Sequence, residues 1–415
     1  MQGSVWQATQ RACKKKKTTK QYSTTEIIDT TATMSRTTPA LVVPELNGKF
    51  EMGEVYLSEM QPDEVLVEIH ATGFCHTDLS CAQGLLPSAP GCVLGHEGAG
   101  VVLEAGSEVT NVAVGDKVLM SFSHCETCHS CTTGHPSYCY AFNERNFGGA
   151  RAAASHSPSS ASMLSANGPD GKPLFSSFFG QSSFARHTLV HRSSVVKVGP
   201  DTDLALYAPL GCGMQTGAGA VLNSLRVREG SSVAVFGVGS VGMAAVMAAA
   251  KISRAEIIIA VDLQQSRLDL AKELGATHRV IGSDKDVVEQ IRKISGVNGG
   301  IGGVDYAVDC TGVQAVIRTM IDSLGTRGRA STVGAPGFGK EVSIDVMNHL
   351  TYGKEYVGCT EGDSNPAEFI PYLMEMQAKG LFPMDRFISY YDMKDYATAI
   401  EDTKTGKAIK AVLKW

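Results

Sequence analysis

The chain has 415 residues, of which 43% are hydrophobic and 19% are charged, and its formal net charge is −5. This length exceeds one ordinary hydrophobic core and indicates more than one domain. No apolar run is long enough and free enough of charge to span a bilayer, and the acidic balance argues against a nucleic-acid-binding surface. We therefore expect neither membrane nor nucleic acid among the partners.

The number and spacing of the cysteines indicate the redox state of the compartment in which the protein works. The chain has 11 cysteines, an odd number, and it shows no apolar core of a secretory signal. Both features argue against a disulfide scaffold, and tight Cys-x2-Cys spacing favours metal binding in a reducing compartment. We expect a cytoplasmic protein.

Residues 1–33 differ from the rest of the chain. They contain the basic run Lys14–Lys17, followed by sequence rich in threonine and serine. We interpret them as a disordered N-terminal extension, with Met34 as the expected start of the functional protein. A mitochondrial transit peptide is the alternative, but clustered lysines with little arginine or leucine make a poor amphipathic helix.

The part of the chain from residue 35 to about 120 is predicted to form short strands between turns. Residues 64–69 alternate polar and apolar side chains, as a half-buried strand does, and residues 100–104 and 116–120 are similar. Residues 121–140 form a cysteine-rich loop. Residues 143–183 are rich in serine, alanine and glycine without clear periodicity, and we expect a long surface excursion there.

From residue 231 onward, strand-like and helix-like segments alternate. Strands are predicted at 232–236, 256–261, 304–309 and 330–333, and helices at 241–252, 265–274, 286–294 and 314–324. This alternation predicts an α/β fold, a parallel sheet with helices on both faces. Residues beyond 360 show no clear helix or strand periodicity.

A glycine-rich turn lies between the first of these strands and its helix. Residues 237–242 read Gly-Val-Gly-Ser-Val-Gly and fit the GxGxxG pattern. The motif follows a predicted strand and opens a predicted helix, which is the arrangement that makes it informative. Gly237 permits the tight turn, Gly239 lets the backbone approach a pyrophosphate, and Gly242 lets helix and strand pack closely. The helix N-terminus, with Ser240 and Val241, would face the phosphate charge.

Asp262 ends the next predicted strand, twenty residues after Gly242. A carboxylate there can accept hydrogen bonds from both ribose hydroxyls of an adenosine and would repel a 2′-phosphate, so we expect NAD rather than NADP. Arg267 could flank the ribose and leaves some tolerance for NADP. The alternative is a glycine turn that binds nothing, with Asp262 as a helix cap.

Four cysteines with tight spacing predict a closed metal site. Cys125, Cys128, Cys131 and Cys139 can surround one Zn²⁺ with thiolates and leave no open position, which makes the site structural. His124, His129 and His135 lie in the same loop. Because four cysteines already fill the coordination shell of a tetrahedral zinc ion, we do not expect these histidines to bind it. Nucleic-acid-binding zinc ribbons separate two Cys-x2-Cys pairs by a longer segment, so this spacing does not fit them.

Three further segments carry candidate ligands, and together with the motifs above they identify a family. They are Gly73–Asp78 (GFCHTD), Gly95–Gly100 (GHEGAG) and Cys212 between two glycines. In their order and spacing, residues 40–415 resemble the zinc-containing medium-chain alcohol dehydrogenases. Asn146-Phe-Gly-Gly, Phe178-Phe-Gly-Gln-Ser-Ser-Phe and the segment Leu210–Gly217 are similar to fungal aryl- or benzyl-alcohol dehydrogenases.

The resemblance implies a domain organisation. A GroES-like, mostly β catalytic domain would span residues 34–212, and a Rossmann coenzyme domain would span 213–358. Residues 359–415 would return to the catalytic domain.

The resemblance also implies a second, catalytic zinc. Cys75, His96 and Cys212 would hold it and leave a fourth position for substrate. Glu97 would lie beside the ligand histidine, and Asp78 would orient that histidine. Cys81 and Cys92 match no motif position and are expected to be packed.

A mechanism follows from the same resemblance. Zinc would lower the pKa of the alcohol, and its carbon would give a hydride to NAD. Thr77 would take the substrate proton and pass it through the ribose. Relatives often end this relay in a histidine where this chain has Ser80, which cannot store a proton, so water or His76 would serve. His76 and, less securely, Lys410 would contact the pyrophosphate, and Val333 would lie in the coenzyme site.

The expected function is interconversion of a primary, aromatic or allylic alcohol and its aldehyde with NAD(H). Two zinc ions per chain and a homodimer or homotetramer are expected. A fungal context of aromatic metabolism or secondary-metabolite biosynthesis rests on the resemblance alone. The alternatives are an S-(hydroxymethyl)glutathione dehydrogenase and a non-enzymatic relative that binds only nucleotide.

Overall fold

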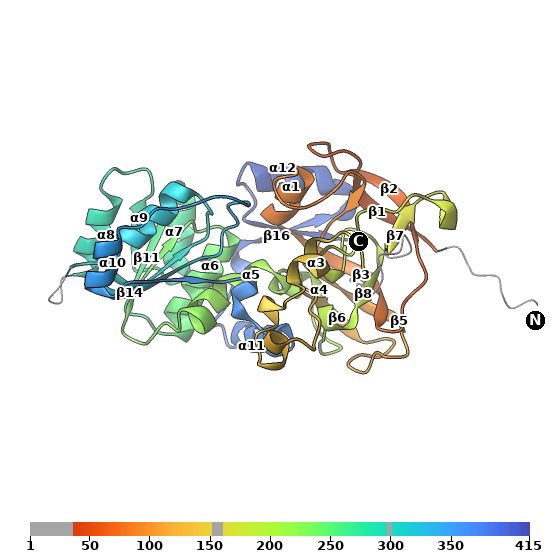
Figure 1. Cartoon of the computed structure of the whole chain (residues 1–415), viewed down its shortest axis with the longest axis horizontal. Helices are drawn as coiled ribbons and strands as arrows, with labels where there is room; N and C mark the ends of the chain where they lie inside the picture. The colour runs from red at the N-terminus through yellow and green to blue at the C-terminus, as the bar shows by residue number, and fades with distance from the viewer. Residues whose placement is uncertain (1–35, 152–160, 297–300) are drawn as a thin grey trace, which may run out of the picture. The chain divides into compact units, whose positions relative to one another are not determined.

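The computed structural model describes residues 36–151, 161–296 and 301–415. The extension predicted over residues 1–33 lies outside the described residues. Figure 1 shows the course of the chain and labels its main elements. Within the described ranges, no helix has the length and apolar character needed to cross a membrane.

Two sheets are built mainly from the N-terminal half. The smaller has the strand order β4-β1-β2-β7, formed by Cys92–Val93, Thr37–Val43, Glu51–Leu57 and Met163–Ser165. The larger has the order β16-β17-β3-β5-β6-β9, with β8 also paired to β3. Its strands are Ile388–Asp392 (β16), Lys410–Lys414 (β17), Glu64–Phe74 (β3), Gly98–Ala105 (β5), Lys117–Met120 (β6), Val195–Lys197 (β9) and His187–His191 (β8).

The last strand joins the chain's end to its beginning. β17 runs antiparallel to the end of β3, with Ala411 opposite Phe74 and Leu413 opposite Thr72. Because Cys75 directly follows β3, this pairing brings the C-terminal segment to the start of the predicted catalytic site. The domain limits themselves stay predictions from the sequence.

The third sheet is parallel throughout and has the order β12-β11-β10-β13-β14-β15. Its strands are Ser232–Phe236 (β10), Ile257–Asp262 (β11), His278–Ile281 (β12), Val304–Asp309 (β13), Leu324–Thr332 (β14) and Glu355–Gly358 (β15). The order reverses between β10 and β13, and in such sheets the crevice at this point is where ligands bind.

Alternate residues of β10 enter two different cores. Val233 and Val235 pack into a cluster that includes Met243 and Leu268, from the helices α6 (Ser240–Met247) and α7 (Gln265–Leu274). Ala234 and Phe236 face the opposite side, where α8 (Val287–Ser295) and α9 (Gln314–Asp322) cover the sheet. Helices thus lie on both faces (Figure 1), which confirms the predicted α/β class.

The remaining helices are short or lie near the sheets of the N-terminal half. They are α1 (His76–Ala82), α2 (His129–Thr132), α3 (Phe142–Phe147), α4 (Leu204–Tyr207), α5 (Gly213–Gly219), α10 (Val346–Tyr352), α11 (Pro366–Ala378) and α12 (Tyr396–Lys404). The predicted helix 265–274 coincides with α7. The predicted helix 241–252 is α6 followed by a π-helical turn, η8 (Ala248–Ile252).

The prediction of a surface excursion is wrong for the end of the 143–183 segment. Residues 176–185 are buried, and Phe178 and Phe179 in the 3-10 turn η4 (Phe178–Gly180) are 0% and 3% exposed. The many serines of this stretch suggested a position at the surface, but their hydroxyls form hydrogen bonds inside the protein. Ser182 Oγ, for example, donates to the Val93 carbonyl at 2.7 Å.

Candidate metal centres and coenzyme pocket

Asp78 connects two of the predicted zinc ligands. Its carboxylate accepts hydrogen bonds from the backbone N–H of Cys75 and of Gly95, each at 3.0 Å. It also lies 3.0 Å from Nδ1 of His96, and neither side chain has any exposed surface. The loop after β3 and the loop before β5 are therefore fixed to each other by one buried carboxylate, as the predicted orienting role of Asp78 requires.

The remaining nitrogen of His96 fits a metal. Because Nδ1 faces Asp78, Nε2 points away from it, and Nε2 is buried without a hydrogen-bond partner. Ligand atoms of Cys75, His96, Glu97 and Cys212 all lie within 4.8 Å of one another. A buried imidazole nitrogen beside two thiols is the donor set that Zn²⁺ prefers, so these residues fit the predicted ion.

Cys212 reaches this cluster from the start of α5. It precedes the helix in a non-helical conformation (φ −144°, ψ −81°), and its neighbour Gly211 has no room for a side chain. A Cβ at residue 211 would lie 2.1 Å from the Met120 carbonyl oxygen. The tight contact with β6 sets the position of the Cys212 thiol.

The two thiols of the cluster differ in acidity. A hydrogen bond from Cys212 and the nearby Lys410 charge hold the pKa of Cys75 well below its ordinary value. The same interaction with Cys75, together with burial, raises the pKa of Cys212. The shift in pKa at Cys75 favours its thiolate, the form that binds metal.

Glu97 and Lys410 form a buried ion pair next to the cluster. Lys410 Nζ lies 2.8 Å from both carboxylate oxygens, and the backbone N–H of Gly213 donates to Oε1 at 3.2 Å. Burial favours the neutral amine, but Glu97 and Cys75 outweigh it and raise the pKa of Lys410. The sequence predicts a pyrophosphate contact for Lys410. The structure directs its ammonium to Glu97, and a direct coenzyme contact stays a prediction.

Gly73 leaves space for that ion pair. A Cβ at residue 73 would lie 1.9 Å from Glu97 Oε2. The glycine of the GFCHTD motif is therefore needed because a carboxylate passes over its Cα.

The four cysteines of the predicted structural site are gathered as expected. Their sulfurs lie within 4.8 Å of one another, and the N–H groups of Cys125 and Cys128 donate to Cys139 Sγ and Cys125 Sγ, each at 3.3 Å. Burial alone would raise the pKa of Cys125, but N–H donors from Thr127 and Cys128 lower it to about 6. N–H donors stabilise thiolates, the form that binds zinc.

The other cysteines and histidines near these sites stay outside them. His129 and His135 are exposed, and His124 is partly buried; none of the three belongs to the cysteine cluster. Cys81 and Cys92 are fully buried, and burial raises the pKa of Cys92 to about 12. Both thiols are packed, as the sequence indicates.

The glycine turn has the geometry expected for a dinucleotide site. Gly237 has a φ of +80°, and a Cβ at Gly242 would lie 2.0 Å from the Gly237 carbonyl oxygen. Asp262 stiffens the turn, since its carboxylate accepts hydrogen bonds from the N–H of Val238 at 2.8 Å and of Gln264 at 2.9 Å. The backbone of the turn is thus free to approach a pyrophosphate, and the Asp262 carboxylate lies beside it, where such folds bind a ribose.

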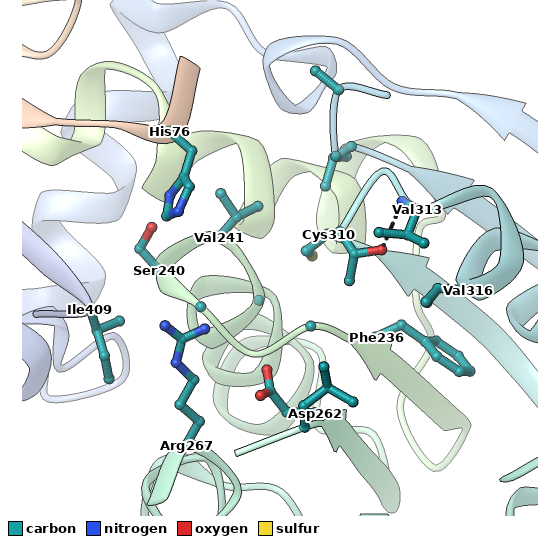
Figure 2. Close-up of a pocket in the computed structure, with 18 of the residues that line it drawn as sticks. His76, Phe236, Ser240, Val241, Asp262, Arg267, Cys310, Val313, Val316 and Ile409 are labelled. Carbon is teal, nitrogen blue, oxygen red and sulfur yellow. Dashed lines mark hydrogen bonds between the residues drawn. The ribbon is translucent and has the colours of Figure 1, made fainter. Parts of the chain in front are cut away.

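A cavity of about 640 Å³ joins this turn to the loop after β3. Figure 2 shows that Asp262, Arg267, Ser240 and His76 point into it from different elements. Every residue predicted to bind coenzyme lines it: His76, Gly237, Gly239, Ser240, Val241, Gly242, Asp262, Arg267, Val333 and Lys410. Cys75, Thr77 and Ser80 line it as well, so the cavity runs from the glycine turn to the metal cluster.

Sequence reasoning missed one ionisable group at the metal cluster. Glu361 lies in the 3-10 turn η9 (Glu361–Asp363), with Oε1 3.8 Å from Cys212 Sγ. Burial raises the pKa of Glu361 to about 7. The only signal in the sequence is the Glu-Gly-Asp turn after the last parallel strand, and nothing in it indicates a position beside Cys212.

Comparisons with known proteins agree with this site. Residues 61–200 match the alcohol dehydrogenase GroES-like domain, and residues 240–379 match the zinc-binding dehydrogenase domain. The chain is 37% identical to a geraniol dehydrogenase of Castellaniella defragrans, over 90% of this chain and 96% of that one.

Two solved structures are also similar. The zinc-binding alcohol dehydrogenase domain protein of Burkholderia ambifaria is 44% identical, with a TM-score of 0.85, over 92% of this chain and 99% of that one. The benzyl alcohol dehydrogenase of Acinetobacter calcoaceticus is 39% identical, with a TM-score of 0.84, over 91% and 99%.

The chain therefore belongs to the zinc-binding medium-chain alcohol dehydrogenase family and is a zinc-dependent alcohol dehydrogenase. The predicted pairing of a GroES-like domain with a Rossmann-like domain is confirmed. The relatives named above are bacterial, and the predicted closeness to fungal enzymes stays a prediction.

If Asp78 orients His96, replacing it should weaken the catalytic metal site while the four-cysteine site stays intact. We expect Asp78→Asn to lower metal affinity there by roughly 10- to 100-fold, because an amide cannot accept all three N–H groups. Chelator competition with zinc counted per chain measures this. Asp201→Asn, at an exposed position, is the control, and equal affinities of the two variants would contradict the role of Asp78.

Proposed function

We propose that this enzyme interconverts a primary aromatic or allylic alcohol and its aldehyde with NAD(H). The observation that carries this proposal is the cavity that runs from the glycine turn to Cys75 and Thr77. Through this cavity, a nicotinamide coenzyme bound at the glycine turn would reach a metal held beside Cys75, which supports the proposal. Two relatives support the substrate class, because geraniol is an allylic alcohol and benzyl alcohol an aromatic one.

The metal end of the cavity suits an apolar substrate. Phe74 and Leu86 line the cavity, and behind its lining the Phe179 ring stacks on His96 at 4.7 Å between centroids. The Phe178 ring meets the same imidazole edge-on at 5.3 Å. These rings exclude water from the imidazole and strengthen its interaction with Asp78.

Cys75, His96 and Cys212 would hold the catalytic zinc, and Cys125, Cys128, Cys131 and Cys139 would hold a second, structural one. When bound, the catalytic zinc supplies a Lewis acid that lowers the pKa of an alcohol hydroxyl, and NAD supplies the hydride acceptor.

The proton would leave through residues of α1. Thr77 Oγ1 lies 3.7 Å from Cys75 Sγ and borders the cavity, so it can accept the substrate's proton and donate its own to a coenzyme ribose. Ser80, one turn along the same helix, borders the cavity but cannot hold a charge at neutral pH. His76 is exposed on this wall and can end the relay, as can water.

The central experiment is a substrate panel followed by NADH absorbance, with benzyl, cinnamyl and short aliphatic alcohols and S-(hydroxymethyl)glutathione. We expect two zinc ions per chain and the highest kcat/KM for the benzyl or cinnamyl alcohol. Cys212→Ala should retain one zinc and lose turnover. Preferred turnover of the glutathione adduct would overturn the proposed substrate class, and full turnover of the variant with one zinc would overturn the site.

Coenzyme choice is proposed to depend on Asp262. Asp262→Asn removes the charge that repels a 2′-phosphate and weakens the bonds to the ribose hydroxyls. We expect kcat/KM with NAD to fall by roughly 10- to 100-fold, the value of about one hydrogen bond to a charged group. The kcat/KM with NADP should rise. Asp201→Asn is the matched control, and an unchanged NAD to NADP ratio in Asp262→Asn would contradict the assignment.

Thr77→Val tests the relay, because valine keeps the shape of threonine and lacks the hydroxyl. We expect kcat to fall by roughly 10²- to 10⁴-fold, the range for loss of a positioned proton acceptor. Zinc content should not change. Thr110→Val, at an exposed position, controls for the loss of a hydroxyl. A Thr77→Val enzyme with unaltered kcat would remove Thr77 from the relay.

A homo-oligomer is also proposed. β15 ends the order of the parallel sheet, and α10, just before it, exposes Val346, Met347 and Leu350 by 66–71%. An edge strand beside exposed apolar side chains is a typical pairing surface. Light scattering should give at least twice the chain mass of 43.9 kDa, and a monomer at micromolar concentration would contradict this proposal.

A cytoplasmic location is proposed because thiols of this spacing need a reducing compartment. A role in fungal aromatic metabolism or secondary-metabolite biosynthesis rests on resemblance alone.

A further inference from the structure

Two carboxylates approach the catalytic cluster, and only one of them has a cation. Both oxygens of Glu97 lie 2.8 Å from Lys410 Nζ. Glu361 has no ion pair with a basic residue among the described parts of the chain. Its Oε2 is buried and without a hydrogen-bond partner there, and the whole residue is only 9% exposed. An ionised carboxylate is costly to bury unless a positive group compensates it, and a metal ion in the cluster would supply that charge.

The distance between Glu361 and Cys212 is compatible with a cation bound by both. Glu361 Oε1 is 3.8 Å from Cys212 Sγ. Two donors of one tetrahedral Zn²⁺, a thiolate at about 2.3 Å and a carboxylate oxygen at about 2.1 Å, lie roughly 3.6 Å apart. The separation is close to that of two ligands on a shared ion. The Glu97 carboxylate also lies in the 4.8 Å cluster, but it already accepts hydrogen bonds from Lys410 and Gly213.

The backbone holds Glu361 in this position against its own preference. Glu361 and Asp363 have φ values of +49° and +46°, in the left-handed region that non-glycine residues rarely adopt. Such conformations persist where the surrounding structure imposes them, and they gather at functional sites.

The surroundings of η9 impose this conformation. Asn223 Nδ2 donates to the carbonyl oxygens of Gly362 and Asp363. Ser364 Oγ donates to the Glu361 carbonyl at 2.6 Å. Gly362 packs so closely on α5 that a Cβ would lie 2.3 Å from the Gln215 carbonyl oxygen. Since Cys212 begins the same helix, Glu361 and Cys212 are positioned by one element.

The four-cysteine loop supports the same turn from the other side. His135 Nδ1 lies 2.8 Å from Asp363 Oδ1, and Tyr138 donates from its hydroxyl to the Gly358 carbonyl at 3.2 Å. Both residues lie between Cys131 and Cys139. The turn that carries Glu361 is thus fixed between α5 and the loop of the structural site.

We propose that Glu361 is an additional oxygen donor to the catalytic metal, and that the alcohol takes its place when it binds. Glu361 would fill the position that Cys75, His96 and Cys212 leave open in the substrate-free enzyme. This proposal rests on the proposed catalytic site, because it needs a metal held by those three residues.

The test replaces the catalytic zinc of the full-length enzyme by Co²⁺, whose visible absorption reports its ligands. We expect Glu361→Gln to change the Co²⁺ spectrum and to weaken Co²⁺ binding by at least about 10-fold in chelator competition. Glu401→Gln, at an exposed position, should match the wild type in both. A Glu361→Gln enzyme with the spectrum and affinity of the wild type would overturn the proposal.

Two further measurements test displacement by the alcohol and the role of Glu361 in a second variant. Benzyl alcohol without coenzyme should shift the Co²⁺ spectrum of the wild type, and the absence of any shift would count against displacement. Where Glu361→Gln does not fold, Glu361→Asp shortens the side chain by one methylene and should also change spectrum and affinity; an unchanged result overturns the proposal. A wild-type enzyme that binds metal only at the four cysteines would instead overturn the proposed catalytic site.

Discussion

The buried carboxylate of Asp78 is the interaction on which the rest of the site depends. It holds the N–H of Cys75, the N–H of Gly95 and the ring of His96 at once. The bond to Cys75 also caps α1, the helix that carries Thr77 and the wall of the coenzyme cavity. One group without exposed surface therefore positions both the candidate metal donors and the proposed proton path, and its burial strengthens each of these bonds.

Local signals predicted a large part of this arrangement. The four cysteines lie within fifteen residues of one another, so their spacing alone indicates a shared ion, and the cluster is as expected. The glycine turn is equally local, because the left-handed Gly237 and the closely packed Gly242 lie within one strand–helix junction. The alternation of strands and helices from residue 231 predicted the parallel sheet, since a buried parallel strand and its covering helix both have clear apolar patterns.

Features that depend on long-range contacts could not be predicted in this way. Glu97 and Lys410 are 313 residues apart, and only the pairing of β17 with β3 brings them together. Glu361 reaches Cys212 through a left-handed turn that no periodicity marks. Phe178 and Phe179 lie in a serine-rich stretch whose hydroxyls are paired internally, so composition indicated surface where the structure has core.

The glycines around the site have a consequence for attempts to redesign this enzyme. Side chains at residues 73, 211, 219 and 362 would overlap Glu97, Met120 or one another's backbone. These positions do not line the cavity, yet a Cβ at any of them would lie within 2.3 Å of another atom. Leu86 and Val313, by contrast, border the cavity and already carry a side chain. A mutant library that aims at new alcohols should therefore vary cavity residues that already carry a Cβ and leave these glycines unchanged, because a side chain there would displace backbone or the Glu97 carboxylate.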